Sequence, residues 1–182
     1  MEVQIRSDTV TLTGYVTATG RDSKLLPPSM TGADKDSYEQ IVPGTFRRAI
    51  EKNGKIEFKL NHSRTIGSLG KELHLTEDAV GLKVRAVTSD PEVVAAAREK
   101  RLTGWSWGMR VLHERPPDVV SDDVIRRYVD EIDLTEVSIL TVEPASVATT
   151  VETRAMSDDV TVLPDYSAKI KYIEIEKERI KL

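Results

Sequence analysis

The sequence predicts an α+β fold that is mostly β, built on an antiparallel sheet or barrel with two or three helices outside it. Apolar and polar residues alternate at period two in about six to eight short segments, as in half-buried strands. Helical patterns are few and short. The strands come in runs and do not alternate regularly with helices, which argues against a doubly wound α/β sheet.

Strand patterns open the chain. Residues 3–17 are β-branched and apolar at short spacing, interrupted by Gly14. Residues 20–38 are rich in Gly, Pro, Ser and Asp, which predicts a long loop. A helix is expected from Thr45, as its N-cap, to about Lys52 before Asn53-Gly54. Residues 55–61 alternate again as a strand.

The second half continues the pattern. Residues 65–88 predict two or three short strands, and Pro91 opens a helix of good helix formers. Residues 103–113 return to period two, and we expect Pro116-Pro117 to end that strand. Further strands are expected over 124–133 and 135–143.

Length and composition predict one domain over residues 1–153 and a C-terminal tail over 154–182. Isoleucines near helical spacing at the end of this tail fit a terminal helix, a partner-docking segment or a linker. The net charge of −4 and the lack of dense Lys/Arg blocks argue against a nucleic-acid partner. No apolar run approaches the roughly 20 residues of a membrane span, and no signal-peptide core opens the chain, so we expect a cytosolic protein.

The stretch GWSWG, residues 104–108, fits the Gly-x-Ser-x-Gly nucleophile elbow of α/β-hydrolases. An elbow needs a helix after the serine, but the following residues alternate like a strand. Such a strand carries His113, the only histidine after Ser106, about 23 Å away at about 3.3 Å per residue. The residues around Ser106 therefore do not fit an α/β-hydrolase.

As a strand, the stretch places Trp105 and Trp107 on one face, expected to be the core face, and Ser106 between two glycines on the other. Glycines in a strand mark close approach of another chain, which a peptide substrate would provide. The alternatives are that the glycines relieve packing against a helix or form a bulge.

A nucleophilic serine needs a base and an orienting acid. Of the three histidines, His62 follows a strand near a turn, whereas His74 and His113 lie within alternating stretches. Glu136 lies inside an apolar strand pattern, where a buried carboxylate needs a partner; a surface-facing glutamate is the alternative. Without cysteines or a His-x-x-x-His or Glu-x-x-His cluster, no metal or other cofactor is expected.

Five segments in order resemble the prohead (procapsid maturation) proteases of tailed bacteriophages, distant relatives of the herpesvirus assembly proteases. The segments are IVPGTFRRAI, FKLNHSRTIGSLG, EDAVGLKVRAV, LTGWSWGMRV and LTEVSILTVEPASVAT, and they span roughly residues 12–152. The resemblance implies a compact, largely antiparallel, herpesvirus-protease-like β-barrel flanked by helices. It also implies a catalytic site with Ser106 as nucleophile, His62 as general base and Glu136 as third member.

The resemblance further implies the partners. The substrates would be the scaffold, the N-terminal extension of the major capsid protein and the protease itself, cut inside the immature procapsid in the host cytoplasm. Herpesvirus relatives suggest a homodimer. Three alternatives stay open: a non-catalytic virion or scaffold-like protein that keeps the fold, a small serine esterase, and a β-rich binding module in which Ser106 only packs.

Overall fold

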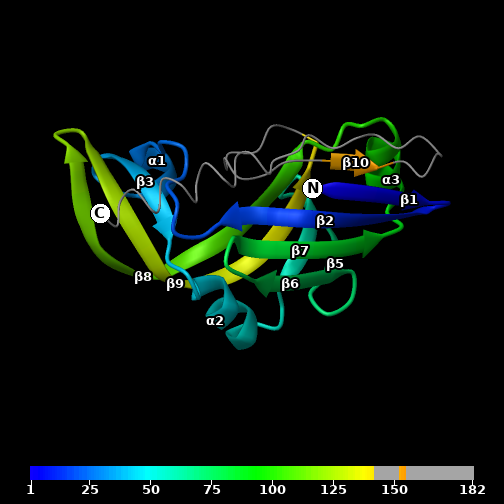
Figure 1. The fold of residues 1–182 in the computed structure, drawn as a ribbon, viewed down its shortest axis with the longest axis horizontal. Coiled ribbons are helices and arrows are strands. Elements are labelled where there is room, and N and C mark those ends of the chain that lie inside the picture. Colours follow the sequence, from blue (N-terminus) through cyan, green and yellow to red (C-terminus); the bar gives the residue numbers. More distant parts are fainter. Residues whose placement is uncertain (142–151, 155–182) are drawn as a thin grey trace, which may run out of the picture.

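The computed structural model describes residues 1–141 and the backbone of residues 152–154. In that part of the chain, ten strands and three short helices form an α+β fold that is mostly β, as the sequence predicts (Figure 1). The tail expected over residues 154–182 lies outside the described residues, apart from the backbone of its first residue.

The described strands form two five-stranded sheets. The first has the order β10-β1-β2-β7-β6, in which only β1 and β10 run parallel. Its strands are β1 (Glu2–Arg6), β2 (Thr9–Ala18), β6 (Leu73–Glu77), β7 (Gly81–Thr88) and β10 (Glu152–Arg154). The second contains β3 (Asp36–Ile41), β4 (Glu57–Leu60), β5 (Arg64–Ser68), β8 (Gly104–Ser121) and β9 (Val124–Leu140). No closed barrel is formed by the described strands, so the barrel stays a prediction.

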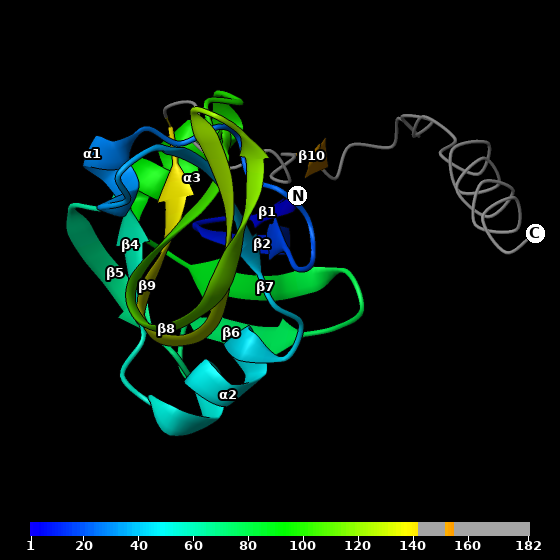
Figure 2. The ribbon, with the colours of Figure 1, turned by 90° about the vertical axis from the view of Figure 1, so that its left-hand side faces the viewer.

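Strand β9 is the central strand of the second sheet. It pairs antiparallel with β8 along its whole length, from Gly104 opposite Leu140 to Ser121 opposite Val124. Its other edge pairs in parallel with β3 at the beginning of the strand and with β4 near the end. The β8–β9 hairpin extends away from the first sheet, beside α1 and β3 (Figures 1 and 2).

The expectation that Pro116-Pro117 ends the strand is wrong, because β8 runs on to Ser121. The pairing register shifts between Arg115 and Asp118, so the prolines lie in an irregular part of the ladder. Within the described residues β8 pairs with β9 alone and is an edge strand. Proline has no N–H to donate, and an edge strand with a bulge tolerates this.

Three short helices flank the sheets: α1 (Pro28–Thr31), α2 (Thr45–Lys52) and α3 (Pro91–Arg98). The predicted bounds of α2 are confirmed, but its N-cap is Gly44, with φ 89°, and not Thr45. The carboxylate of Glu77 accepts hydrogen bonds from the backbone N–H groups of Gly44 and Arg47 at 2.6 and 2.7 Å. Thr45 is buried, and its hydroxyl donates to the Asp130 carbonyl at 3.2 Å. None of the helices in the described ranges is long and apolar enough to cross a membrane.

Side chains on one face of strands β4, β8 and β9 pack in the hydrophobic core. Trp105 is fully buried against Phe58 of β4, with ring centroids 6.1 Å apart. Trp107 is half-buried and meets Phe46 of α2 edge-on, with centroids 4.9 Å apart. Both tryptophans lie on the same face of β8, as predicted, which leaves Ser106 on the opposite face.

Candidate active site

The face of the second sheet opposite the tryptophans carries the candidate catalytic side chains. Across the β8–β9 pair, Ser106 lies opposite Ser138 and Gly108 lies opposite Glu136. The ladder is irregular just beyond this point, because Gly108 pairs with Glu136 but Met109 pairs with Leu134. A bulge of this kind re-aims side chains and is common beside active sites.

Gly108 makes room for the Glu136 side chain. A Cβ atom added at Gly108 would lie 2.7 Å from Glu136 Oε1 and 2.8 Å from its Cγ, closer than real Cβ contacts. Gly108 thus makes room for a carboxylate of the neighbouring strand and not for a helix, and it lies at the register shift that the bulge alternative expects.

His62 reaches this face through a strained turn after β4. Asn61 and His62 have φ values of 50° and 61°, in the left-handed region that costs a residue with a Cβ about 1–2 kcal/mol. Hydrogen bonds to the end of β9 offset this cost. The Asn61 side chain donates to Thr141 Oγ1 and accepts from the Thr141 N–H, both at 2.9 Å, and the Asn61 N–H donates to the Ile139 carbonyl at 3.0 Å.

Glu136 joins His62 to Ser138. Its Oε1 lies 2.5 Å from His62 Nδ1, and its Oε2 accepts a hydrogen bond of 2.5 Å from the Ser138 hydroxyl. Ser138 Oγ in turn accepts the His62 backbone N–H at 3.2 Å. Only 7% of Glu136 and none of Ser138 is exposed, so the carboxylate is buried with a partner for each oxygen, as a buried carboxylate requires. Glu136 is thus not the surface-facing glutamate of the alternative.

Ser106 shares a groove with His62. The groove has a volume of about 570 Å³, and both residues line it. No hydrogen bond joins Ser106 to His62 within the described residues, and the Nε2 atom of His62 has no partner there. Such hydrogen bonds are often long in a free enzyme and tighten only with substrate. The structure therefore bonds His62 to Glu136 and places Ser106 in the same groove as His62.

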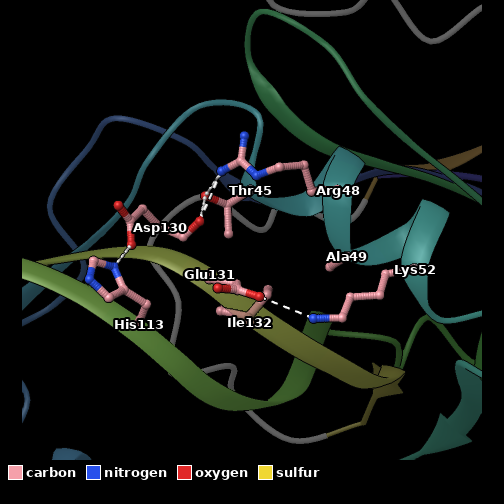
Figure 3. Close-up of a pocket in the computed structure, with 8 residues that line it drawn as sticks. All are labelled: Thr45, Arg48, Ala49, Lys52, His113, Asp130, Glu131 and Ile132. Carbon is pink, nitrogen blue, oxygen red and sulfur yellow. Dashed lines mark hydrogen bonds and ion pairs between the residues drawn. The ribbon is translucent and has the colours of Figure 1, made fainter.

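A second histidine–carboxylate pair lies elsewhere, at a cavity of about 370 Å³ between α2 and the β8–β9 hairpin (Figure 3). His113 Nδ1 lies 2.5 Å from Asp130 Oδ1, and this carboxylate raises the pKa of the histidine. Among the described residues, the one hydroxyl that lines the cavity belongs to Thr45, which already donates to a backbone carbonyl. In this part of the chain the pair therefore has no hydroxyl beside it that is free to act as a nucleophile.

Two charged residues near the site are bonded to each other. Arg110 of β8 is exposed, and its guanidinium lies 3.1 Å from Asp133 Oδ2. Asp133 also accepts a hydrogen bond from the Asn53 side chain. No group of three or more metal-ligating side chains occurs in the described ranges. Sequence reasoning missed Ser138 and Asn61; the two-residue spacing of Glu136 and Ser138, which puts both on one strand face, is the signal for the former.

One comparison with known proteins identifies a family for this chain. Residues 1–161 match the family model described as caudovirus prohead serine protease. Searches of curated proteins and of solved structures returned no significant match. Because the family model spans most of the 182 residues, the chain belongs to the caudovirus prohead serine protease family.

Proposed function

We propose that this chain is a serine endopeptidase with Ser106 as nucleophile, His62 as general base and Glu136 as the acid that orients the base. The observation that carries the proposal is the buried Glu136 carboxylate bonded to His62 Nδ1, in a groove that Ser106 also lines. With Nδ1 held by Glu136, the Nε2 atom of the imidazole is the one left to face the serine.

The proposed reaction follows from these positions. The Ser106 oxygen attacks a peptide carbonyl while its proton passes to His62 Nε2. The tetrahedral intermediate collapses, the C–N bond breaks, and His62 gives the proton to the leaving amine. Water, deprotonated by His62 in the same way, then hydrolyses the acyl-enzyme. Glu136 keeps the tautomer with a proton on Nδ1 and stabilises the imidazolium that forms.

The substrates and the setting rest on family membership. We propose that the chain cuts the scaffold, the N-terminal extension of the major capsid protein and itself, inside the immature procapsid in the host cytoplasm. We further propose a homodimer and, for the whole chain, the herpesvirus-protease-like barrel. A size-exclusion and light-scattering measurement tests the dimer, and an experimental structure tests the barrel.

The test of activity is intact-mass spectrometry of the chain co-expressed with its major capsid protein. The variants are Ser106→Ala, His62→Gln and Glu136→Gln, with Ser121→Ala as a control because Ser121 is an exposed serine at the far end of the same strand. Defined fragments are expected with the unchanged chain and with Ser121→Ala, and none with Ser106→Ala. Equal full-length masses in assembled shells would favour a non-catalytic virion protein, and equal fragments throughout would indicate a host protease.

A fluorophosphonate probe separates the remaining alternatives. We expect covalent labelling at Ser106 that is lost in the His62→Gln variant. Turnover of short acyl esters far above that of any capsid peptide would favour an esterase. A chain that is unlabelled both free and in assembled shells would favour a binding module.

A further inference from the structure

The groove beside Ser106 has a wall made by a segment far from it in sequence. Besides Ser106 and His62, the groove is lined by residues from the end of β2, the following loop, α1 and β3. In Figure 2, α1 stands beside the β8–β9 hairpin, on the side away from α2. The long loop predicted over residues 20–38 is thus one wall of the candidate active site.

This wall is firmly attached. Leu26 and Ser37 exchange two backbone hydrogen bonds of 2.9 Å, which tie the loop to β3. Asp22 receives two hydrogen bonds from the Arg126 guanidinium, at 2.7 and 2.8 Å, which tie the loop to β9. Because these contacts bind the wall to both β3 and β9, its side chains keep a defined position relative to Ser106.

The wall nevertheless leaves apolar side chains open to the groove. Helix α1 buries none of its residues, and Met30 is 63% exposed. The apolar residues that line the groove are Ala18, Leu26, Met30, Ile41, Trp107 and Met109. Polar residues share the lining, and a groove of about 570 Å³ that combines apolar surface with polar groups is typical of a ligand site. A wall that is anchored by polar contacts but apolar toward the groove fits a substrate side chain of the same character.

The acidic and basic side chains that line the groove differ in whether they have an ion-pair partner. Its two carboxylates outside the catalytic group, Asp22 and Glu39, are each paired with an arginine, Arg126 and Arg127. Arg21 lines the same groove, is exposed, and has no ion-pair partner within the described residues. The side chain that enters beside it therefore meets an uncompensated positive charge.

We propose that this groove is the specificity site of the peptidase, and that it selects an extended peptide with an apolar residue next to the scissile bond and an acidic rather than a basic residue near Arg21. The apolar side chain contacts Met30 and Leu26 on the wall. This inference rests on the proposed function, because it places the scissile carbonyl at Ser106.

The test uses the full chain and a randomised decapeptide library, with cleavage products read by mass spectrometry. We expect apolar residues at one position flanking the cut to be favoured at least tenfold over lysine. The Met30→Lys variant should lower kcat/KM for those peptides at least tenfold, whereas Val80→Lys, at another exposed apolar residue outside the groove, should not. Arg21→Glu should reverse the preference for acidic over basic residues. Cleavage without an apolar preference, or with one that Met30→Lys leaves intact, overturns the proposal.

A second measurement does not depend on turnover. The Ser106→Ala variant is incubated with peptides that carry a photoreactive diazirine analogue of leucine, with or without a neighbouring glutamate, and the crosslinked residues are mapped. Crosslinks on the segment from Leu26 to Met30 support the specificity site even if the chain cuts nothing, in which case only the proposed activity fails. Crosslinks spread elsewhere on the surface, or none, overturn the groove assignment while cleavage by the unchanged chain still supports a peptidase.

Discussion

Replacing Ser138 with alanine is expected to impair the site although all three proposed catalytic side chains remain unchanged. The Ser138 hydroxyl is fully buried, donates to Glu136 Oε2 at 2.5 Å and accepts the His62 N–H at 3.2 Å. A hydrogen bond to a charged group contributes about 1.5–3 kcal/mol, and its loss leaves a buried carboxylate oxygen unpaired. If that energy holds Glu136 in register with His62, the rate falls by about 10- to 150-fold, at about 1.4 kcal/mol for each factor of ten.

The assay is the rate of fluorophosphonate labelling of Ser106 together with kcat/KM on a peptide cut by the unchanged chain. Ser37→Ala is the matched control, because Ser37 is equally buried and its hydroxyl has no partner in the described part of the chain. A double-mutant cycle separates positioning from general destabilisation: in a Glu136→Ala background, Ser138→Ala should cost little further activity. A Ser138→Ala variant that reacts within twofold of the unchanged chain, or that loses the same activity with and without Glu136, would show that Ser138 does not position Glu136.

Three further changes test the surrounding structure. Gly108→Ala should abolish labelling and lower the free energy of unfolding by about 1–3 kcal/mol, measured by urea denaturation, because its Cβ would lie 2.7 Å from Glu136 Oε1. Asn61→Ala should cost about 1–3 kcal/mol of that free energy and slow labelling, because it removes both side-chain hydrogen bonds that hold the His62 turn on β9; an unchanged urea midpoint would contradict this. The hydrogen bond between His113 and Asp130 raises the pKa of the histidine and lowers the pKa of the aspartate. The pair therefore stabilises the fold at a pH above the usual carboxyl pKa. This stabilisation is lost as the pH rises through the raised pKa of His113. His113→Asn should therefore lower the urea midpoint at pH 5.5 and leave it unchanged at pH 9, without affecting labelling.

The fold elements that the sequence predicts are those that depend on neighbours in the chain. Period two in GWSWG assigns Trp105 to the core and Ser106 to the other face, and both assignments hold because alternation is local geometry. The cap of α2 could not be predicted in this way, because it comes from Glu77, on a strand about 30 residues away. The end assigned to β8 at Pro116 failed for a related reason. Whether a proline ends a strand depends on which edge of that strand is paired, and pairing is a property of the sheet.

For the candidate site as well, some features follow from the local sequence and others depend on the tertiary structure. That Glu136 needs a partner follows from a carboxylate within an apolar strand, and the structure supplies two, His62 and the Ser138 hydroxyl. Which histidine would be that partner does not follow from pattern, since the Asp130 carboxylate holds His113 at the same 2.5 Å. What distinguishes the two pairs is the surface each one faces. His62 faces the groove that contains Ser106, whereas the one hydroxyl that the described residues place at the cavity beside His113 is already bonded. A histidine–carboxylate pair therefore indicates a catalytic base only together with a nucleophile on the same surface, and strand pairing places the proposed nucleophile, Ser106, opposite Ser138.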